Sequence, residues 1–202
     1  MDKNRIWDLY APFYNGVMKR NQAIYDKNCR RIRRVIAGRR VLELAAGTGL
    51  VSRQVAASAA SYIATDLSEK MMEQAMKGEL PEQLSFMRAD AAELPFEDGS
   101  FDAVIISNAL HIIPKPERVL AEVRRVLVPN GIFIAPNFIH RDSGVLNRAV
   151  IAAFAALGIG LETRWDADGF VEFIEENGFR VVNKAVSPAM IPMIYTESQR
   201  KP

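Results

Sequence analysis

The chain has 202 residues, of which 49% are hydrophobic and 25% are charged. This length and composition are typical of one globular domain with a substantial core, so we expect residues 1–202 to form a single domain. The formal net charge of +2 is close to balance, which argues against a nucleic-acid partner because such proteins usually carry a clustered basic face. The single cysteine, Cys29, cannot form an internal disulfide and suits a reducing cytoplasm.

The sequence predicts no targeting or membrane-spanning segment. Residues 1–8 contain no apolar core followed by a small-residue cleavage site, so we expect no signal peptide. The most hydrophobic segment, residues 149–161, has no charge but is shorter than the ~20 residues that span a bilayer. We therefore expect a cytoplasmic protein with no transmembrane helix.

The first strong helical pattern is basic. Tyr25, Cys29, Ile32 and Ile36 recur at spacings of four, three and four, which indicates the buried stripe of an amphipathic helix with its arginines turned outward. A solvated surface is the simplest interpretation of those arginines. Attraction to an anionic membrane or substrate is the alternative, so peripheral membrane contact stays open.

Strand-like and helical patterns then alternate along the chain. Five apolar runs are separated by helical patterns: residues 40–45, 61–66, 84–89, 101–107 and 131–136. Such alternation predicts parallel strands joined by crossover helices. Two further runs, 179–186 and 189–196, are joined by so short a connection that they must be antiparallel. We therefore expect a Rossmann-like α/β fold whose seven-stranded, mostly parallel sheet has one antiparallel strand and helices on both faces.

Helix signals lie between these runs. We expect helices over residues 68–77, 117–127 and 166–177, the first of them starting at the capping residue Ser68. Pro192 cannot donate to a ladder, so we expect irregular pairing in the last strand. The domain divides into an N-terminal lid and helix (1–36), a cofactor-binding core (37–136), a substrate-side insertion (137–165) and a C-terminal helix and hairpin (166–202).

Polar residues and glycines gather at the carboxyl ends of the predicted strands, where open parallel sheets bind their ligands. They are Glu43, Gly47 and Gly49 after the first strand, Asp66 after the second, Asp90 after the third, Ser107, Asn108 and His111 after the fourth, and Asn137 and His140 after the fifth. Each has a structural alternative, since such an aspartate often caps a helix and a glycine pair often forms a turn. Their joint occurrence favours a nucleotide-sized site.

The blocks that carry these residues occur in a characteristic order. They are Glu43-Leu-Ala-Ala-Gly-Thr-Gly49, Ala64-Thr-Asp-Leu-Ser68, Asp90-Ala-Ala-Glu-Leu-Pro-Phe96, Phe101-Asp102 and the segment from Pro116 to Gly131. Together they resemble the class I S-adenosylmethionine-dependent methyltransferases, and within them the group of quinone-biosynthesis and small phospholipid N-methyltransferases. The resemblance covers about residues 36–136.

The resemblance implies a role for each strand-end residue. Ala45, Gly47 and Gly49 would wrap the methionine part of S-adenosylmethionine, and Glu43 would steady that loop or the cofactor amine. Asp66 would bind the ribose hydroxyls, Leu67 would pack on the adenine, Asp90 and Ala91 would read its edge, and Asn108 would line the methionine end. Ala45 and Asn130 stand where the family usually has glycine. No metal site is expected.

Methyl transfer needs alignment and exclusion of water more than acid-base groups. Where the acceptor carries a proton, a histidine could act as the base, and we expect His111 in that role, with a surface or capping histidine as the alternative. The acceptor would contact Tyr10 and Tyr14 of an aromatic lid over residues 7–15, together with Asn137, His140 and Phe154. Because residues 149–161 have almost no polar face, we expect a hydrophobic or amphipathic acceptor with an O, N or S nucleophile.

Other functions stay open. A protein that binds the cofactor without catalysis has the same motifs. A nucleic-acid methyltransferase would usually carry an Asn/Asp-Pro-Pro-aromatic block where this chain has Ser107-Asn-Ala-Leu110. A nicotinamide enzyme fits less well, because Ser52 stands at the third glycine position of the dinucleotide motif. The sequence leaves monomer and homodimer equally open.

Overall fold

The computed structural model describes residues 3–18, 21–139, 163, 165–188 and 192–201. The α-helices in these ranges are α1 (Lys3–Met18), α2 (Gln22–Val35), α3 (Ser52–Val55), α4 (Glu69–Ala75), α5 (Pro116–Val126) and α7 (Ala167–Glu176). Two short 3₁₀ helices are η2 (Ala56–Ser58) and η3 (Leu110–Ile112). The strands are β1 (Arg40–Leu44), β2 (Ser61–Asp66), β3 (Leu84–Arg88), β4 (Phe101–Ile106), β5 (Leu127–Ile134), β6 (Asn137–Phe138), β7 (Phe179–Ser187) and β8 (Met193–Arg200).

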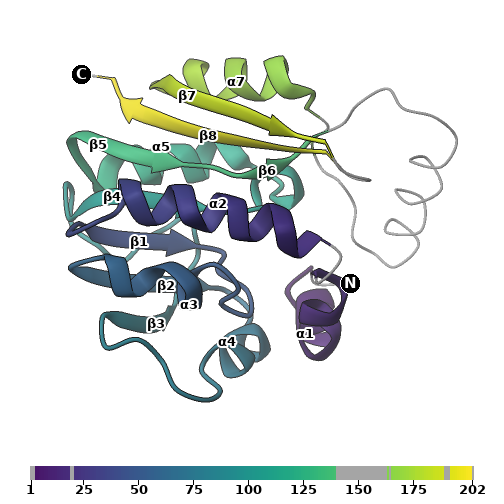
Figure 1. The fold of residues 1–202 in the computed structure, drawn as a ribbon. Coiled ribbons are helices and arrows are strands. Elements are labelled where there is room, and N and C mark those ends of the chain that lie inside the picture. Colours follow the sequence, from purple (N-terminus) through teal and green to yellow (C-terminus); the bar gives the residue numbers. More distant parts are fainter. Residues whose placement is uncertain (1–2, 19–20, 140–162, 164, 189–191, 202) are drawn as a thin grey trace, which may run out of the picture.

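The strands form one sheet in the order β3-β2-β1-β4-β5-β8-β6, with β7 paired to β8 (Figure 1). Strands β1 to β5 pair in parallel, while β8 runs antiparallel to β5, β6 and β7. This confirms the mostly parallel sheet with one reversed strand. The eighth strand, β6, was not expected, because its two residues are too few to show a period-two pattern and pair only where β8 lies beside them.

Alternate residues of the central strands enter two separate cores, one on each face of the sheet. Val41 of β1 packs with α2 on one face, whereas Leu42 and Leu44 pack with α5 and α7 on the other. The alternation arises because successive side chains of a strand point to opposite faces. Both faces are therefore covered by helices, as the sequence predicted.

Local capping begins two of the helices where the sequence indicated. The side chain of Ser68 accepts a hydrogen bond from the Met71 N–H, and that of Asp166 accepts one from the Gly169 N–H. The irregular pairing expected at Pro192 is wrong, since β8 begins one residue later at Met193. A residue without an N–H is easily accommodated just outside a ladder, and the register shift lies instead between Val181 and Asn183 of β7.

The strand order places a topological switch point at the centre of the sheet. From β1 the chain proceeds outward through β2 and β3, and then returns to add β4 on the other side of β1. Open α/β sheets bind their ligands at such a point, because the loops that leave the carboxyl ends of the two neighbouring strands run in opposite directions there. None of the helices in the described part of the chain has the length and apolarity needed to cross a bilayer.

Candidate functional site

The loop after β1 turns through three residues with left-handed backbone. The φ angles are 50° at Ala45, 57° at Gly47 and 75° at Gly49. A Cβ added to Gly47 would meet only the Met71 sulfur at 4.0 Å, whereas a Cβ on Gly49 would lie 3.3 Å from both Ala75 and Phe86. Gly49 is therefore needed for close packing under the loop, and Gly47 leaves space beside it for a ligand.

Asp66 ties this loop to the end of β2. Its carboxylate oxygens accept hydrogen bonds from the Gly47 N–H at 2.7 Å and the Ser68 N–H at 2.8 Å. Burial raises the pKa of the Asp66 carboxyl, and these backbone hydrogen bonds oppose that rise. A carboxylate has about four acceptor positions, so Asp66 keeps capacity for a ribose diol. Leu67, the next residue, is half-buried at the same edge.

The loop after β3 is held by an ion-paired clamp on α5. Asp90 is exposed and accepts from the Ala92 N–H at 2.8 Å, and half-buried Ala91 lies between them. Further along the loop, Glu122 accepts from the Leu94 N–H at 2.7 Å, while Arg125 donates to the Leu94 carbonyl and also to Glu122. The clamp fixes the segment in which the resemblance puts the adenine contacts.

Asn108, after β4, has one amide oxygen with no partner. Its φ is 53°, and its N–H donates to the Pro136 carbonyl at 2.8 Å. The side-chain nitrogen donates to the Tyr25 hydroxyl at 2.8 Å, and the buried Oδ1 accepts no hydrogen bond. A buried acceptor without a donor is unfavourable, so this atom fits a site that receives a donor such as the amino group of a bound methionine.

The loops that follow β1, β2 and β4 form one polar rim at the carboxyl end of the sheet. Helix α1 contacts this rim at two points. Asp8 accepts a hydrogen bond from the Ser68 hydroxyl at 2.6 Å. Tyr14 is hydrogen-bonded to Tyr25, and burial together with the negative charge of Asp66 raises the pKa of Tyr14 to about 12. The predicted lid segment thus contributes Tyr14 to the rim beside Asp66. Figure 1 shows α1 next to α4 and to the start of α2.

His111 and Asn137 form a buried pair that the strand order brings together. His111 Nδ1 lies 3.0 Å from Asn137 Oδ1, and Asn137 Nδ2 donates to the Phe138 carbonyl at 2.9 Å. Because that carbonyl can only accept, the Asn137 oxygen must face the histidine, so Nδ1 carries the proton and Nε2 is unprotonated. Burial lowers the pKa of His111 and outweighs the opposing effect of Asn137.

Glu43 lies inside the core rather than at the exposed ends of the strands. Its side chain is 1% exposed and accepts a hydrogen bond from the Tyr62 hydroxyl at 2.9 Å. Burial raises the pKa of the Glu43 carboxyl to about 7. Asn137, expected to contact the acceptor, is likewise 1% exposed and uses both of its amide ends within the protein.

Some predicted residues lie outside this description, and others were missed. His140, Phe154 and the side chain of Tyr10 fall outside the described residues. Tyr25 was expected only as part of a buried stripe, although its hydroxyl reaches Asn108. Asp8 was not singled out either. Helical spacing identifies which face of α2 is buried, but it does not indicate that the Tyr25 side chain on that face reaches the rim.

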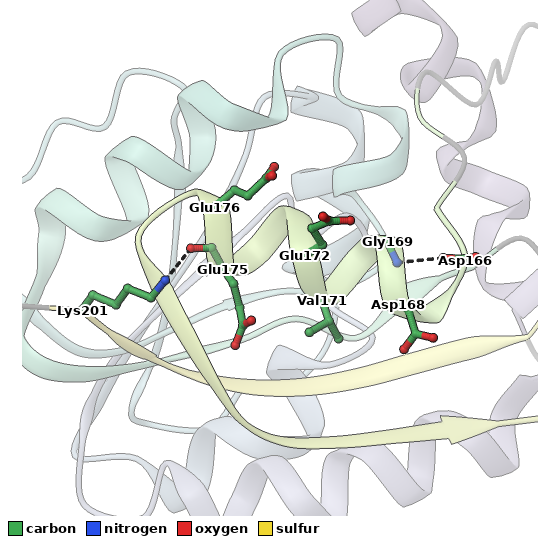
Figure 2. Close-up of a pocket in the computed structure, with 8 residues that line it drawn as sticks. All are labelled: Asp166, Asp168, Gly169, Val171, Glu172, Glu175, Glu176 and Lys201. Atoms are coloured by element: carbon green, nitrogen blue, oxygen red, sulfur yellow. Dashed lines mark hydrogen bonds between the residues drawn. The ribbon is translucent and has the colours of Figure 1, made fainter.

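A separate groove lies on the outer surface of α7 and contains none of the predicted site residues. It is lined by Asp166, Asp168, Gly169, Val171, Glu172, Glu175, Glu176 and Lys201 (Figure 2). Lys201 donates to the Glu175 carbonyl at 2.7 Å. The lining of this groove is strongly acidic, unlike the mixed polar rim at the carboxyl ends of β1, β2 and β4.

Comparisons with known proteins show similarity to methyltransferases. Residues 42–135 match the family described as "Methyltransferase domain". The chain is 35% identical over 162 residues to a demethylmenaquinone methyltransferase of Clavibacter sepedonicus, covering 79% of this chain and 54% of that protein. It is 36% identical over 143 residues to the ubiquinone/menaquinone biosynthesis C-methyltransferase UbiE of Brucella anthropi, covering 66% of this chain and 54% of that protein. The chain thus spans about half the length of these relatives.

A solved structure matches the whole fold. It is a chain from the Haloferax volcanii complex between the Trm112 methyltransferase activator and a putative methyltransferase, with a TM-score of 0.81 and 21% identity. The alignment covers 97% of this chain and 98% of that one. At this identity the likeness concerns the fold. Residues 42–135 therefore form a methyltransferase domain of the matched family, which confirms the resemblance to class I S-adenosylmethionine-dependent methyltransferases that the sequence predicted.

Proposed function

We propose that the protein transfers a methyl group from S-adenosylmethionine to a lipophilic hydroquinone. The observation that carries this proposal is the rim itself, where Asp66, the Ala45–Gly49 loop and the unpartnered Oδ1 of Asn108 fit the cofactor. His111, three residues after Asn108 in the chain, offers a base. The names of the two relatives supply the acceptor class and add carbon to the O, N or S nucleophiles expected from the sequence.

The residues divide the cofactor between them. Asp66 would bind the ribose hydroxyls, Leu67 would pack on the adenine, and Asp90 with Ala91 would read the adenine edge. The turn from Ala45 to Gly49 would surround the methionine carboxylate end, and Asn108 Oδ1 would accept from its ammonium group. When bound, S-adenosylmethionine supplies a methyl group activated by a positively charged sulfur.

His111 would prepare the acceptor by removing a proton. Its neutral ring carries the proton on Nδ1, so Nε2 can take the hydrogen of a hydroquinone hydroxyl. The charge left on that oxygen is delocalised onto the ring carbon beside it, which becomes the nucleophile. The methyl group would pass to that carbon with S-adenosylhomocysteine as the leaving group. The ring carbon would then lose its own hydrogen as a proton, and the oxygen would regain the proton held by His111. Aromaticity returns, and the reaction releases one proton overall.

Asn137 would act through His111 and not by touching the acceptor. Both ends of its amide are bound, one to His111 and the other to the Phe138 carbonyl. These bonds hold the ring in one tautomer and one orientation, which is the function of the third member in many catalytic arrangements. The predicted acceptor contacts also include four residues outside this pair: Tyr10, Tyr14, His140 and Phe154. The cytoplasmic location stays a prediction as well.

The proposal is tested with methyl-labelled cofactor and paired acceptors. A demethylated naphthohydroquinone with a short prenyl tail should gain one methyl group on carbon, identified by mass spectrometry and NMR, and the same head group without the tail should react more slowly. Exposed Asp168→Asn serves as the control variant. Cofactor binding without transfer to any of these compounds would contradict the catalytic assignment, and methylation of hydrophilic acceptors alone would contradict the acceptor class.

A further inference from the structure

Helix α2 and the residues that follow it concentrate positive charge. Residues 22–40 hold seven of the 26 basic side chains of the protein but one of its 24 acidic ones, Asp26. The rest of the chain is therefore net negative. A charge separation of this size produces a directional field around a protein whose net charge is small.

Three of these cations form an exposed stripe. Lys27, Arg30 and Arg34 are exposed and follow spacings of three and four, which puts them on one side of α2. The opposite side of the helix, with Cys29 and Ile32, is buried against the sheet. Within the described residues, no carboxylate lies within ion-pair distance of this stripe.

The other basic residues of this segment differ from the stripe: Arg39 is half-buried, and the remaining three have partners. Arg40 binds Asp102 through two nitrogens, and Arg33 donates to the Gln54 carbonyl. Arg31 stacks over the ring of Tyr195 at 5.2 Å. The Lys27–Arg30–Arg34 stripe is therefore the part of this basic segment that is left to face an external partner.

The opposite face of the molecule carries negative charge. Helix α7 packs on the other core of the sheet from α2, and its exposed surface displays the carboxylates seen in Figure 2. Residues 166–177 contain five acidic side chains and no basic one. A negatively charged plane would attract α2 and repel α7, so electrostatics alone would orient the protein.

We propose that the Lys27–Arg30–Arg34 stripe docks the protein on an anionic lipid bilayer. Two observations favour a bilayer over another polyanion. Leu9 of helix α1 is 68% exposed, α1 is joined to α2 by the hydrogen bond between Tyr14 and Tyr25, and an exposed large apolar side chain is typical of helices that bind at a membrane interface. Helices α1 and α2 also hold the rim, through Asp8 to Ser68 and Tyr25 to Asn108. Docking would thus bring the site close to the membrane, which is useful if the acceptor is lipophilic, so the proposal rests in that part on the proposed function.

Vesicle co-sedimentation of the full chain tests the docking. Phosphatidylcholine vesicles with and without one quarter phosphatidylglycerol are compared at low and high salt. Binding should require the anionic lipid and weaken with salt. Since each basic side chain near such a surface contributes about fivefold in partitioning, the triple variant Lys27→Glu/Arg30→Glu/Arg34→Glu should bind at least about a hundredfold more weakly.

A second triple variant controls for net charge. Lys77→Glu/Lys115→Glu/Arg118→Glu changes the charge equally at exposed residues outside α2, and it should lower vesicle binding far less. Thermal unfolding establishes that both variants are folded. Equal losses in the two variants, or vesicle binding that ignores the anionic lipid, would overturn the proposal. So would tighter, stripe-dependent binding to a short RNA or DNA duplex.

The outcomes separate this proposal from the proposed function. The sedimentation needs neither cofactor nor acceptor, so docking can be established even if no methyl transfer is found. Conversely, the stripe variant should methylate a tail-less, water-soluble hydroquinone as fast as the unaltered protein, and lose rate only with a prenylated acceptor presented in anionic vesicles. If the stripe variant and the unaltered protein methylated the prenylated acceptor in anionic vesicles at the same rate, that result would also overturn the docking.

Discussion

The 3.0 Å contact between His111 Nδ1 and Asn137 Oδ1 joins η3 to β6 inside the protein. The Phe138 carbonyl orients Asn137, Asn137 orients the histidine ring, and burial keeps that ring neutral by lowering its pKa. This arrangement fixes the tautomer and the orientation of the ring, as the proposed role of His111 as a base requires. Its consequences for pH dependence can be measured directly.

We expect the turnover number to fall at low pH, as His111 gains a proton. Because its pKa lies below the ordinary 6.5, the base stays neutral and active to lower pH than an exposed histidine would. Asn137→Asp puts a carboxylate against the ring, which should raise the pKa of His111 by about one unit or more. The acidic limb of the pH profile, where turnover falls as His111 is protonated, should then move to higher pH. His111→Ala should lower turnover by about 10²-fold or more.

Calorimetric affinity for S-adenosylmethionine controls these variants. It should change little in either one, because neither residue belongs to the cofactor-binding set. An acidic limb that stays in place in Asn137→Asp would argue against the positioning of His111 by Asn137. A general loss of stability would lower turnover at every pH and leave the limb where it is.

Asp66 should govern cofactor affinity. Asp66→Ala removes an acceptor for the ribose and also releases the Gly47 and Ser68 N–H groups. Charge-assisted hydrogen bonds contribute about 1.5 to 3 kcal/mol, so we expect binding to weaken roughly ten- to hundredfold in calorimetry. The exposed Asp168→Asn should bind normally, and equal affinity in Asp66→Ala would refute the ribose assignment.

Replacing Ala45 with glycine should stabilise the protein, although glycine loses more conformational entropy on folding than alanine does. Its φ of 50° strains a residue with a Cβ by about 1–2 kcal/mol, whereas the added freedom of the unfolded glycine chain costs about 0.4–1 kcal/mol. Ala45→Gly should raise the free energy of unfolding by roughly 0.5–1 kcal/mol. The same change in the α5 helix, Ala121→Gly, should lower it by about 1 kcal/mol, and urea denaturation of both variants checks the opposite signs.

Glu43 should make stability fall as the pH rises. The carboxyl titrates at 4.5 when unfolded and at about 7 when folded, so the folded state holds a proton that the unfolded state releases. Its contribution is complete below pH 4.5 and is lost as the pH rises through 7. Glu43→Gln is neutral throughout, so its free energy of unfolding should match the unaltered protein at pH 4.5 and exceed it at pH 8 by about 3 kcal/mol.

The comparison between variants is needed because His111 has the opposite effect. Its lowered pKa means that the unfolded state binds the extra proton, so this contribution is present above pH 6.5 and is lost as the pH falls below it. Taking the difference between Glu43→Gln and the unaltered protein at each pH removes that background. The exposed Glu117→Gln should show no such difference.

Local sequence determined much of the fold. The bounds of β2 agree with the predicted run, and Ser68 and Asp166 begin their helices through hydrogen bonds that reach only three residues along the chain. Alternating apolar residues likewise identified strands covered on both faces. These features depend on neighbours in sequence, so patterns of residue type are enough to predict them.

The tertiary structure decided what the site residues touch. Asn108 meets Tyr25 across 83 positions, and His111 meets Asn137 because η3 lies beside β6. Strand β6 forms because β8 pairs with it. The buried Glu43 carboxyl accepts a hydrogen bond from the Tyr62 hydroxyl of β2. Hydrogen bonds extend only about 3 Å. Which partners come within that distance depends on strand order and helix packing, and no local pattern in the sequence specifies either.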